Sequence, residues 1–156
     1  MPADAAATRS CAQALARVLP DRARVFTSPL LRCTQLAQAL QRLRPELAAT
    51  PDARLVEMDF GVWEGWRWAD IPKPAIDAWT LDFAHTRFGG RESVQQLMDR
   101  VASMRVFSYT LGVPVVWLTH AGVIRAGTLL SARIRQLHRA DQWPVDGPAY
   151  GECRIL

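Results

Sequence analysis

The stretch that decides the fold runs from Val115 to Arg125, VVWLTHAGVIR, where an apolar run ends at one histidine and a helical pattern follows at once. Unbroken apolar runs are typical of strands buried on both faces of a mainly parallel sheet. We therefore predict a strand over Val113 to Thr119 and a helix from Gly122 to about Ala132. Chemistry in such sheets gathers at the carboxyl ends of the strands, which is where His120 falls.

The rest of the chain alternates between helical and strand patterns, with no repeat, low-complexity segment or linker to divide it. This alternation predicts an α/β fold, with helices covering both sides of a mostly parallel sheet in three α/β/α layers, and residues 1–156 forming a single domain. Further helices are predicted over residues 5–19, 28–43, 68–71, 74–83 and 93–109, and further strands over residues 25–27, 54–58 and 149–156.

Composition excludes several classes of protein. The chain has 156 residues, of which 49% are hydrophobic and 22% charged, a balance typical of a globular domain with its own core. The apolar runs are far shorter than the roughly 20 residues of a membrane span, and Met1 to Asp4 does not begin a signal peptide. We expect a cytoplasmic protein with no membrane partner.

Three scattered cysteines without a C-x-x-C pair indicate neither a disulfide framework nor a zinc site.

The positive charge of the chain is almost entirely arginine, since Lys73 is the only lysine in a formal net charge of +4. Arginine forks suit phosphate and carboxylate groups. Nucleic-acid binding would require a clustered basic face with aromatic side chains among it, whereas these arginines are spread along the chain. We therefore expect no nucleic-acid partner, and the sequence makes no prediction of oligomeric state.

Two charged residues fall at positions suited to anion chemistry. Arg32 lies in the first turn of the helix that Ser28 and Pro29 begin, where unpaired amides and the helix dipole favour an anion. Glu57 ends the strand predicted over residues 54–58, so its carboxylate is placed to act as an acid or base in a cleft. Taken alone, each is better explained as a solvated surface charge.

His120 is the third candidate. It precedes a turn whose backbone amides, at Ala121 and Gly122, are placed to bind an anion, and histidine is the side chain that changes charge near neutral pH. Taken alone, His120 also has the ordinary explanation of a hydrogen-bonded histidine in the core.

Together these positions fall within segments that resemble one family. The segments are TSPLLRCTQ (27–35), LVEMDFGVWEG (55–65), GGRES (89–93) and LTHAGVIR (118–125). Their order and spacing resemble the histidine phosphatase superfamily, the phosphoglycerate mutase-like proteins, over nearly the whole chain from about Arg24. The Trp63-Glu64-Gly65 form looks most like the alpha-ribazole phosphatase branch of cobalamin biosynthesis.

The resemblance implies a phosphoglycerate mutase-like fold and a phosphomonoesterase that works through a phosphohistidine intermediate, without a metal or cofactor. It implies that the substrate is a small phosphorylated metabolite such as alpha-ribazole 5'-phosphate. By position, Arg32 matches the arginine that clamps phosphate, Glu57 the general acid and base, and His120 the second histidine, which stabilises the phosphoryl group. Ser28 and the amides of Ala121 and Gly122 are the further substrate-binding candidates.

One motif of the family is not matched. Members begin with an apolar strand that ends in Arg-His-Gly or a close variant, whereas the histidines of this sequence are His85, His120 and His138. We expect the chain to be truncated, with this strand encoded upstream of Met1. In the family it is central, between the strands that lead to Ser28 and His120. Without it we expect these two strands to pair directly or leave a gap, long edges to lack partners, and no phosphohistidine to form.

A substitute nucleophile is not indicated. The segment Cys11 to Arg17 fits the C-x5-R spacing of cysteine-dependent phosphatases, but it has alanine and leucine in a helical pattern where that loop needs glycine. We interpret Cys11 as a small core residue and His85 as a solvated loop residue.

Three alternatives to a phosphatase remain open. One is a non-catalytic phosphate-binding protein that keeps an anion pocket from Arg32, Glu57 and His120. The others are a phosphoglycerate mutase, although the chain has no obvious insertion to hold a bisphosphate, and a module that binds nucleic acid or protein through its arginines. Four tryptophans either line a pocket for an aromatic base or pack internally: Trp63, Trp66, Trp68 and Trp79.

Overall fold

The computed structural model describes residues 4–156. Its helices are α1 (Ala5–Val18), α2 (Leu31–Leu43), α3 (Lys73–Leu81), α4 (Val94–Thr110) and α5 (Ala121–Ser131). Its strands are β1 (Arg24–Thr27), β2 (Ala49–Pro51) and β3 (Val115–Leu118). Short 3-10 turns lie at η1 (Pro45–Leu47), η2 (Ala53–Leu55), η3 (Gly61–Trp63), η4 (Trp68–Asp70), η5 (Phe88–Gly90) and η6 (Ala140–Gln142).

The strands form a parallel sheet in the order β2-β1-β3. The pairing of β1 with β3 aligns Arg24 with Val115 and Thr27 with Leu118, so the strands that lead to Ser28 and His120 are direct neighbours. Of the two arrangements expected for them, the structure has direct pairing and not a gap. The expectation of two long unpaired edges is wrong, because each strand covers an edge of the other.

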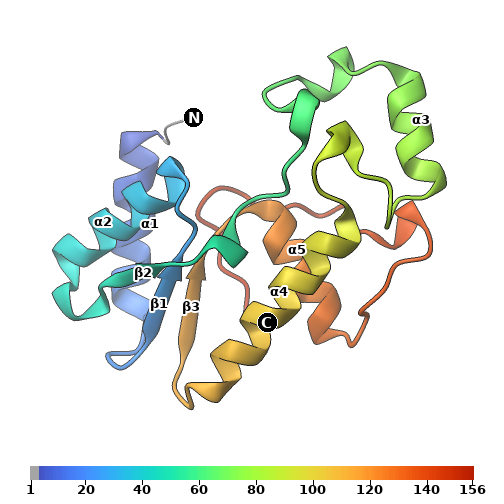
Figure 1. The fold of residues 1–156 in the computed structure, drawn as a ribbon. Helices are drawn as coiled ribbons and strands as arrows, with labels where there is room; N and C mark the ends of the chain where they lie inside the picture. Colours follow the sequence, from blue (N-terminus) through green and yellow to red (C-terminus); the bar gives the residue numbers. More distant parts are fainter. Residues whose placement is uncertain (1–3) are drawn as a thin grey trace.

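Helices cover both faces of this sheet (Figure 1), as the three-layer prediction required. Successive side chains of a strand point to opposite faces, and β1 shows this directly. Val25 is buried among residues of α1 and α2, whereas the next residue, Phe26, is buried among residues of α4 and α5. The fold is therefore a three-layer α/β arrangement, with its layers held by two hydrophobic clusters.

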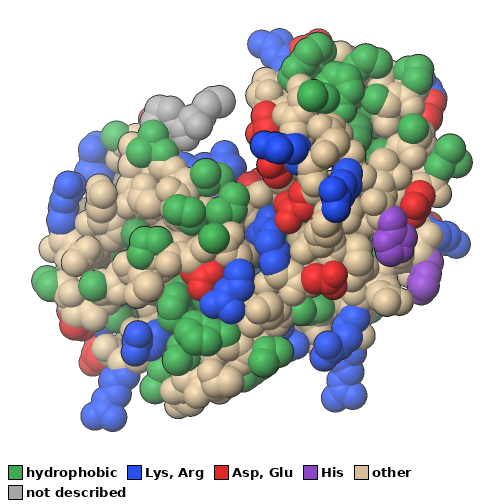
Figure 2. Space-filling model, in the orientation of Figure 1, with side chains coloured by type: hydrophobic (Ala, Val, Ile, Leu, Met, Phe, Trp, Pro, Cys, Tyr) green, Lys and Arg blue, Asp and Glu red, His purple; other side chains and the backbone are tan. Residues whose placement is uncertain are grey.

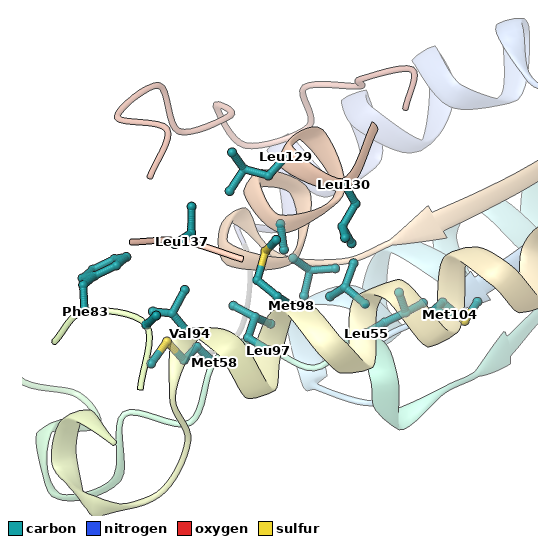
Figure 3. Close-up of a cluster of buried hydrophobic side chains, with 14 of the residues drawn as sticks. Leu55, Met58, Phe83, Val94, Leu97, Met98, Met104, Leu129, Leu130 and Leu137 are labelled. Carbon is teal, nitrogen blue, oxygen red and sulfur yellow. The ribbon is translucent and has the colours of Figure 1, made fainter. Parts of the chain in front are cut away.

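The larger cluster lies between α4 and α5 (Figure 3). Leu97 of α4 and Val123 of α5 are fully buried, and Leu55 joins them from the segment after β2. Each fully buried aliphatic side chain contributes about 1.5–3 kcal/mol to folding. A capping box between Ser93 and Gln96 fixes where α4 begins. Leu55 ties the segment that carries Glu57 to this core.

Two predicted strands are wrong. Residues 54–58 form the turn η2 and an irregular segment, because the Asp52 carboxylate accepts the Arg54 N–H at 2.9 Å and turns the chain. The strand lies instead at β2, a few residues earlier. Residues 149–156 form no strand either, since this tail packs across helices: Tyr150 bonds Thr8 of α1, with 2.9 Å between their hydroxyl oxygens.

Strand β3 also departs from its prediction. Its first three residues are only partly buried, and Leu118 alone is buried. The cause is its position, since β3 lies at one edge of the sheet and not in its middle. Within residues 4–156, no helix combines the length and hydropathy that crossing a membrane requires.

Residues between Glu57 and Ser93 form a second lobe around α3, which stands away from the sheet in Figure 1. It contains a stacked aromatic cluster: the Trp79 and Phe88 rings stack with centroids 4.4 Å apart, and the exposed Trp68 stacks on both. Two glycine turns close the lobe. Gly61 and Gly89 have φ values of 53° and 75°, and a Cβ added at Gly89 would lie 1.8 Å from the Phe60 carbonyl oxygen.

We predict that Gly89→Ala destabilises the protein far more than Gly90→Ala. Both glycines have positive φ, so both alanines add backbone strain of about 1–3 kcal/mol, but only position 89 meets another backbone. We expect the free energy of unfolding in urea to fall by at least about 2 kcal/mol more for Gly89→Ala. Equal losses in the two variants would show that the crossing of these turns does not constrain the lobe.

Candidate functional site

The site forms where β1 and β3 end. Parallel neighbours end at the same edge of a sheet, so Ser28 after β1 and His120 after β3 lie side by side. The ladder continues into the site, because the Ser28 N–H donates to the Leu118 carbonyl oxygen at 2.8 Å. Both side chains are buried, with His120 only 4% exposed.

His120 is held between Arg32 and Ser28. The Arg32 Nε–H donates to His120 Nδ1 at 2.9 Å, and the Ser28 Oγ lies 2.8 Å from His120 Nε2. Because an arginine can only donate, Nδ1 must accept, and the imidazole proton therefore sits on Nε2 and points at the Ser28 hydroxyl. The Cys33 Sγ lies 3.5 Å from the same nitrogen. His120 is thus a neutral imidazole of defined tautomer.

The electrostatics agree with this geometry. Burial, together with the positive charges of Arg32 and Arg100, lowers the pKa of His120 from 6.5 to about 4. Burial raises the pKa of the Cys33 thiol to about 11, so this thiol is protonated at neutral pH. Cys33 therefore contacts the His120 ring as a neutral thiol and is not an activated nucleophile.

Glu57 lies at the N-terminus of α5. Its Oε2 accepts the Gly122 N–H at 3.2 Å and its Oε1 accepts the Met58 N–H at 3.0 Å. A carboxylate is stabilised there by the unpaired amides and the helix dipole. A Cβ at position 122 would lie 2.3 Å from Glu57 Oε1, so a larger residue there would displace the carboxylate. Glu57 therefore accepts the Gly122 N–H, which the sequence analysis predicted to bind phosphate.

The structure thus brings the predicted residues together in two groups of contacts around the start of α5. Arg32 and Ser28 contact His120, and Glu57 contacts Gly122. Ala121 is the first residue of α5 and is half-buried between these contacts. Ser28 does not cap α2 as predicted: the helix begins at residue 31, and the Ser28 hydroxyl accepts the Leu30 N–H at 3.2 Å just before it.

Sequence reasoning missed several contributors. The Thr119 hydroxyl donates to the Leu55 carbonyl oxygen at 2.7 Å and ties the end of β3 to the segment that carries Glu57. Arg100 of α4 reaches the same segment, and no local pattern marks it. Cys33 lies within the segment TSPLLRCTQ, but no role at the site was predicted for it. His85 is exposed and Cys11 is buried within α1, as expected, and His138 is exposed as well.

An open pocket of about 410 Å³ lies beside Glu57. It carries three carboxylates and one guanidinium. Its lining residues are Ala53, Val56, Glu57, Asp59, Glu92, Gln96 and Arg100. Figure 2 shows acidic and basic side chains gathered in the notch between the sheet and the α3 lobe. Among residues 4–156 no group of three or more His, Cys, Asp or Glu side chains is arranged to hold a metal ion.

The profile of the histidine phosphatase superfamily (branch 1) matches residues 5–149. The chain belongs to this superfamily. The mycobacterial glucosyl-3-phosphoglycerate phosphatase solved with inorganic phosphate is 22% identical, with a TM-score of 0.70 over 92% of this chain and 72% of that chain. Its VO3 complex gives a TM-score of 0.76 at 23% identity, covering 94% of this chain and 73% of that chain.

TTHB049 from Thermus thermophilus is 29% identical, with a TM-score of 0.59 over 80% of this chain and 67% of that chain. A search of curated proteins finds no match. The mycobacterial structures, at their low identity, establish a shared fold with this histidine phosphatase-family chain.

We predict that His120 makes stability depend on pH in a defined window. Its pKa is about 4 in the folded chain against 6.5 for an ordinary histidine, so the unfolded chain takes up a proton first as pH falls. This contribution to stability is complete above pH 6.5 and is lost as pH falls to about 4, by about 3 kcal/mol.

Urea unfolding of the wild type and of His120→Gln at pH values from about 7.5 down to about 4 measures this loss, which should be absent from the variant. The exposed His85 supplies the matched control, since His85→Gln should keep the wild-type profile. Identical pH profiles for the wild type and His120→Gln would contradict a buried neutral imidazole.

Proposed function

We propose that this chain forms the phosphoryl-binding site of a phosphatase that acts on a small phosphorylated metabolite. The observation that carries the proposal is the Arg32–His120–Ser28 contact at the shared end of two parallel strands, beside the N-terminus of α5. Membership of the histidine phosphatase superfamily supports the reaction class.

Arg32 is the residue that binds the phosphoryl oxygens in this proposal. Its side chain is exposed, and within residues 4–156 its Nη1 and Nη2 groups make no hydrogen bond, so they can take two phosphoryl oxygens as a fork. A bound dianion also competes with His120 Nδ1 for the Nε–H. Once released from Arg32 and placed beside a negative charge, His120 gains a proton and becomes a second donor.

Glu57 is the group that handles protons. Its carboxyl group lies beside the amides at the start of α5. In the protonated form it can give its proton to the leaving oxygen, and the resulting carboxylate can then take a proton from the attacking water. In this scheme a histidine supplied by an N-terminal extension forms a bond to phosphorus as the ester P–O bond breaks, the leaving oxygen takes the Glu57 proton, and water later breaks the P–N bond to release phosphate. The attacking histidine that the family resemblance implies is not among the 156 residues, since only His120 of its three histidines lies in the site.

Two substrates have separate support. The Trp63-Glu64-Gly65 form favours alpha-ribazole 5'-phosphate, whereas similar mycobacterial structures are glucosyl-3-phosphoglycerate phosphatases. We propose alpha-ribazole 5'-phosphate as the first substrate to test and glucosyl-3-phosphoglycerate as the comparison. A non-catalytic phosphate-binding role is the second candidate function, favoured by the direct pairing of β1 with β3.

We predict that Arg32→Lys weakens binding of inorganic phosphate about tenfold or more, because lysine cannot offer a planar fork. Titration calorimetry or 31P NMR of the 156-residue chain measures this directly. Arg42→Lys is the matched control, since Arg42 is an exposed arginine in the last turn of the same helix. Equal affinities for the wild type and Arg32→Lys would remove Arg32 from the site.

We predict phosphatase activity for an N-terminally extended version that supplies an Arg-His strand, and a loss of about 10²–10⁴-fold in kcat for Glu57→Gln within it. The 156-residue chain should bind phosphate, and its intact mass should show no phosphohistidine after incubation with a phosphomonoester. Binding without turnover in both versions would favour the non-catalytic role, and absence of phosphate binding in both would exclude either function.

A further inference from the structure

The segment that carries Glu57 has no strand to hold it. Residues 56–60 follow the turn η2 without regular hydrogen bonding, and neither neighbouring strand pairs with them. Leu55 and Met58 are buried on either side of Glu57 and anchor the segment by packing, together with the Thr119 hydroxyl that donates to the Leu55 carbonyl oxygen. Apolar packing is non-directional: it keeps the segment buried but does not set the orientation of the Glu57 side chain. Polar contacts are therefore needed to orient the carboxylate toward α5.

One guanidinium supplies most of those contacts. Arg100 of α4 donates from Nη1 to the Arg54 carbonyl oxygen at 2.8 Å and from Nη2 to the Glu57 carbonyl oxygen at 3.2 Å. It therefore bridges the backbone on both sides of Leu55. The backbone carbonyl of the candidate acid–base residue is bonded to it directly.

Glu92 completes the arrangement. Its carboxylate accepts hydrogen bonds from Arg100 Nε at 2.7 Å and from Nη2 at 3.1 Å. The Arg100 side chain is only 20% exposed and the Glu92 side chain 16%. The same carboxylate accepts the Asp59 N–H at 3.0 Å. Arg100 and Glu92 thus grip the segment before and after Glu57, which leaves little freedom for its backbone to rotate.

We propose that Arg100, held by Glu92, is the positioning residue that aims the Glu57 carboxylate at the Gly122 amide. The proposal rests on the proposed function only for the role of Glu57 in proton transfer. In this role Arg100 does not contact the substrate and acts through the backbone of residues 54–59.

The contacts require arginine and not merely a positive charge. Three nitrogens of Arg100 reach two carbonyl oxygens and one carboxylate in a single plane, and an ammonium group cannot span these positions. The charge has a separate effect, because Arg100 helps to hold the pKa of His120 near 4. Arg100→Lys therefore separates geometry from charge: it should disturb Glu57 while leaving the titration of His120 unchanged.

The test is the pH titration of the Gly122 amide in ¹⁵N–¹H NMR spectra of the 156-residue chain, since this amide reports the Glu57 carboxylate that it contacts. The wild type should show an inflection that Glu57→Gln abolishes. Arg100→Lys should reduce the amplitude of that inflection at least twofold, with the amide spectrum otherwise that of a folded protein. Arg105→Lys is the matched control on the same helix, because Arg105 donates to Leu130 and not to this segment.

A folded Arg100→Lys chain with the full wild-type inflection would overturn the proposal. If Arg100→Lys does not fold, Glu92→Gln decides the matter: it keeps both carbonyl contacts of Arg100 but weakens the grip at Asp59, so a smaller loss of amplitude supports the proposal and no loss overturns it. In an active extended version, Arg100→Lys should lower kcat about tenfold with KM nearly unchanged. Failure of phosphate binding in the wild type would refute the proposed function, while the Gly122 titration would still decide the role of Arg100.

Discussion

The parallel pairing of β1 with β3 is the constraint on which the site depends. It brings Ser28 and His120 to one end of the sheet, and the same register turns Phe26 toward the core between α4 and α5. A slip of one residue would exchange the faces of β1 and move each of these side chains to the wrong side. The core and the site are therefore fixed by one ladder, and neither can change register without the other.

The site satisfies its own polar groups. Arg32 donates to a neutral His120, and Glu57 takes an amide at the start of α5. Leaving such groups buried and unpaired costs about 1–3 kcal/mol each, so a ligand must replace the contacts that it breaks. A phosphate dianion offers an arginine more than a neutral imidazole does, whereas it is repelled by the Glu57 carboxylate. The Arg32 contact therefore favours a phosphate dianion, and a proton between Glu57 and the bound oxyanion removes the repulsion between them.

Much of this arrangement could be predicted from the sequence, for identifiable reasons. Helical periodicity located the main helices to within a few residues, and the rule that chemistry follows strand ends joined Ser28 to His120. The strand over residues 54–58 was predicted wrongly, because a short apolar run does not reveal that Asp52 will turn the chain. Arg100 left no local signal, since its partners lie 8, 43 and 46 residues away.

The irregular segment around Glu57 explains why its carboxylate is oriented by α4 and α5 and not by the sheet. A strand would have set its direction through the backbone ladder, alternating strictly between faces. Here Arg100 holds the backbone from α4, and Gly122 receives the side chain at α5. These two helices also share the larger core cluster, so their relative position is rigid. Glu57 is consequently oriented by two helices that share the larger core cluster, although it lies on a segment without regular structure.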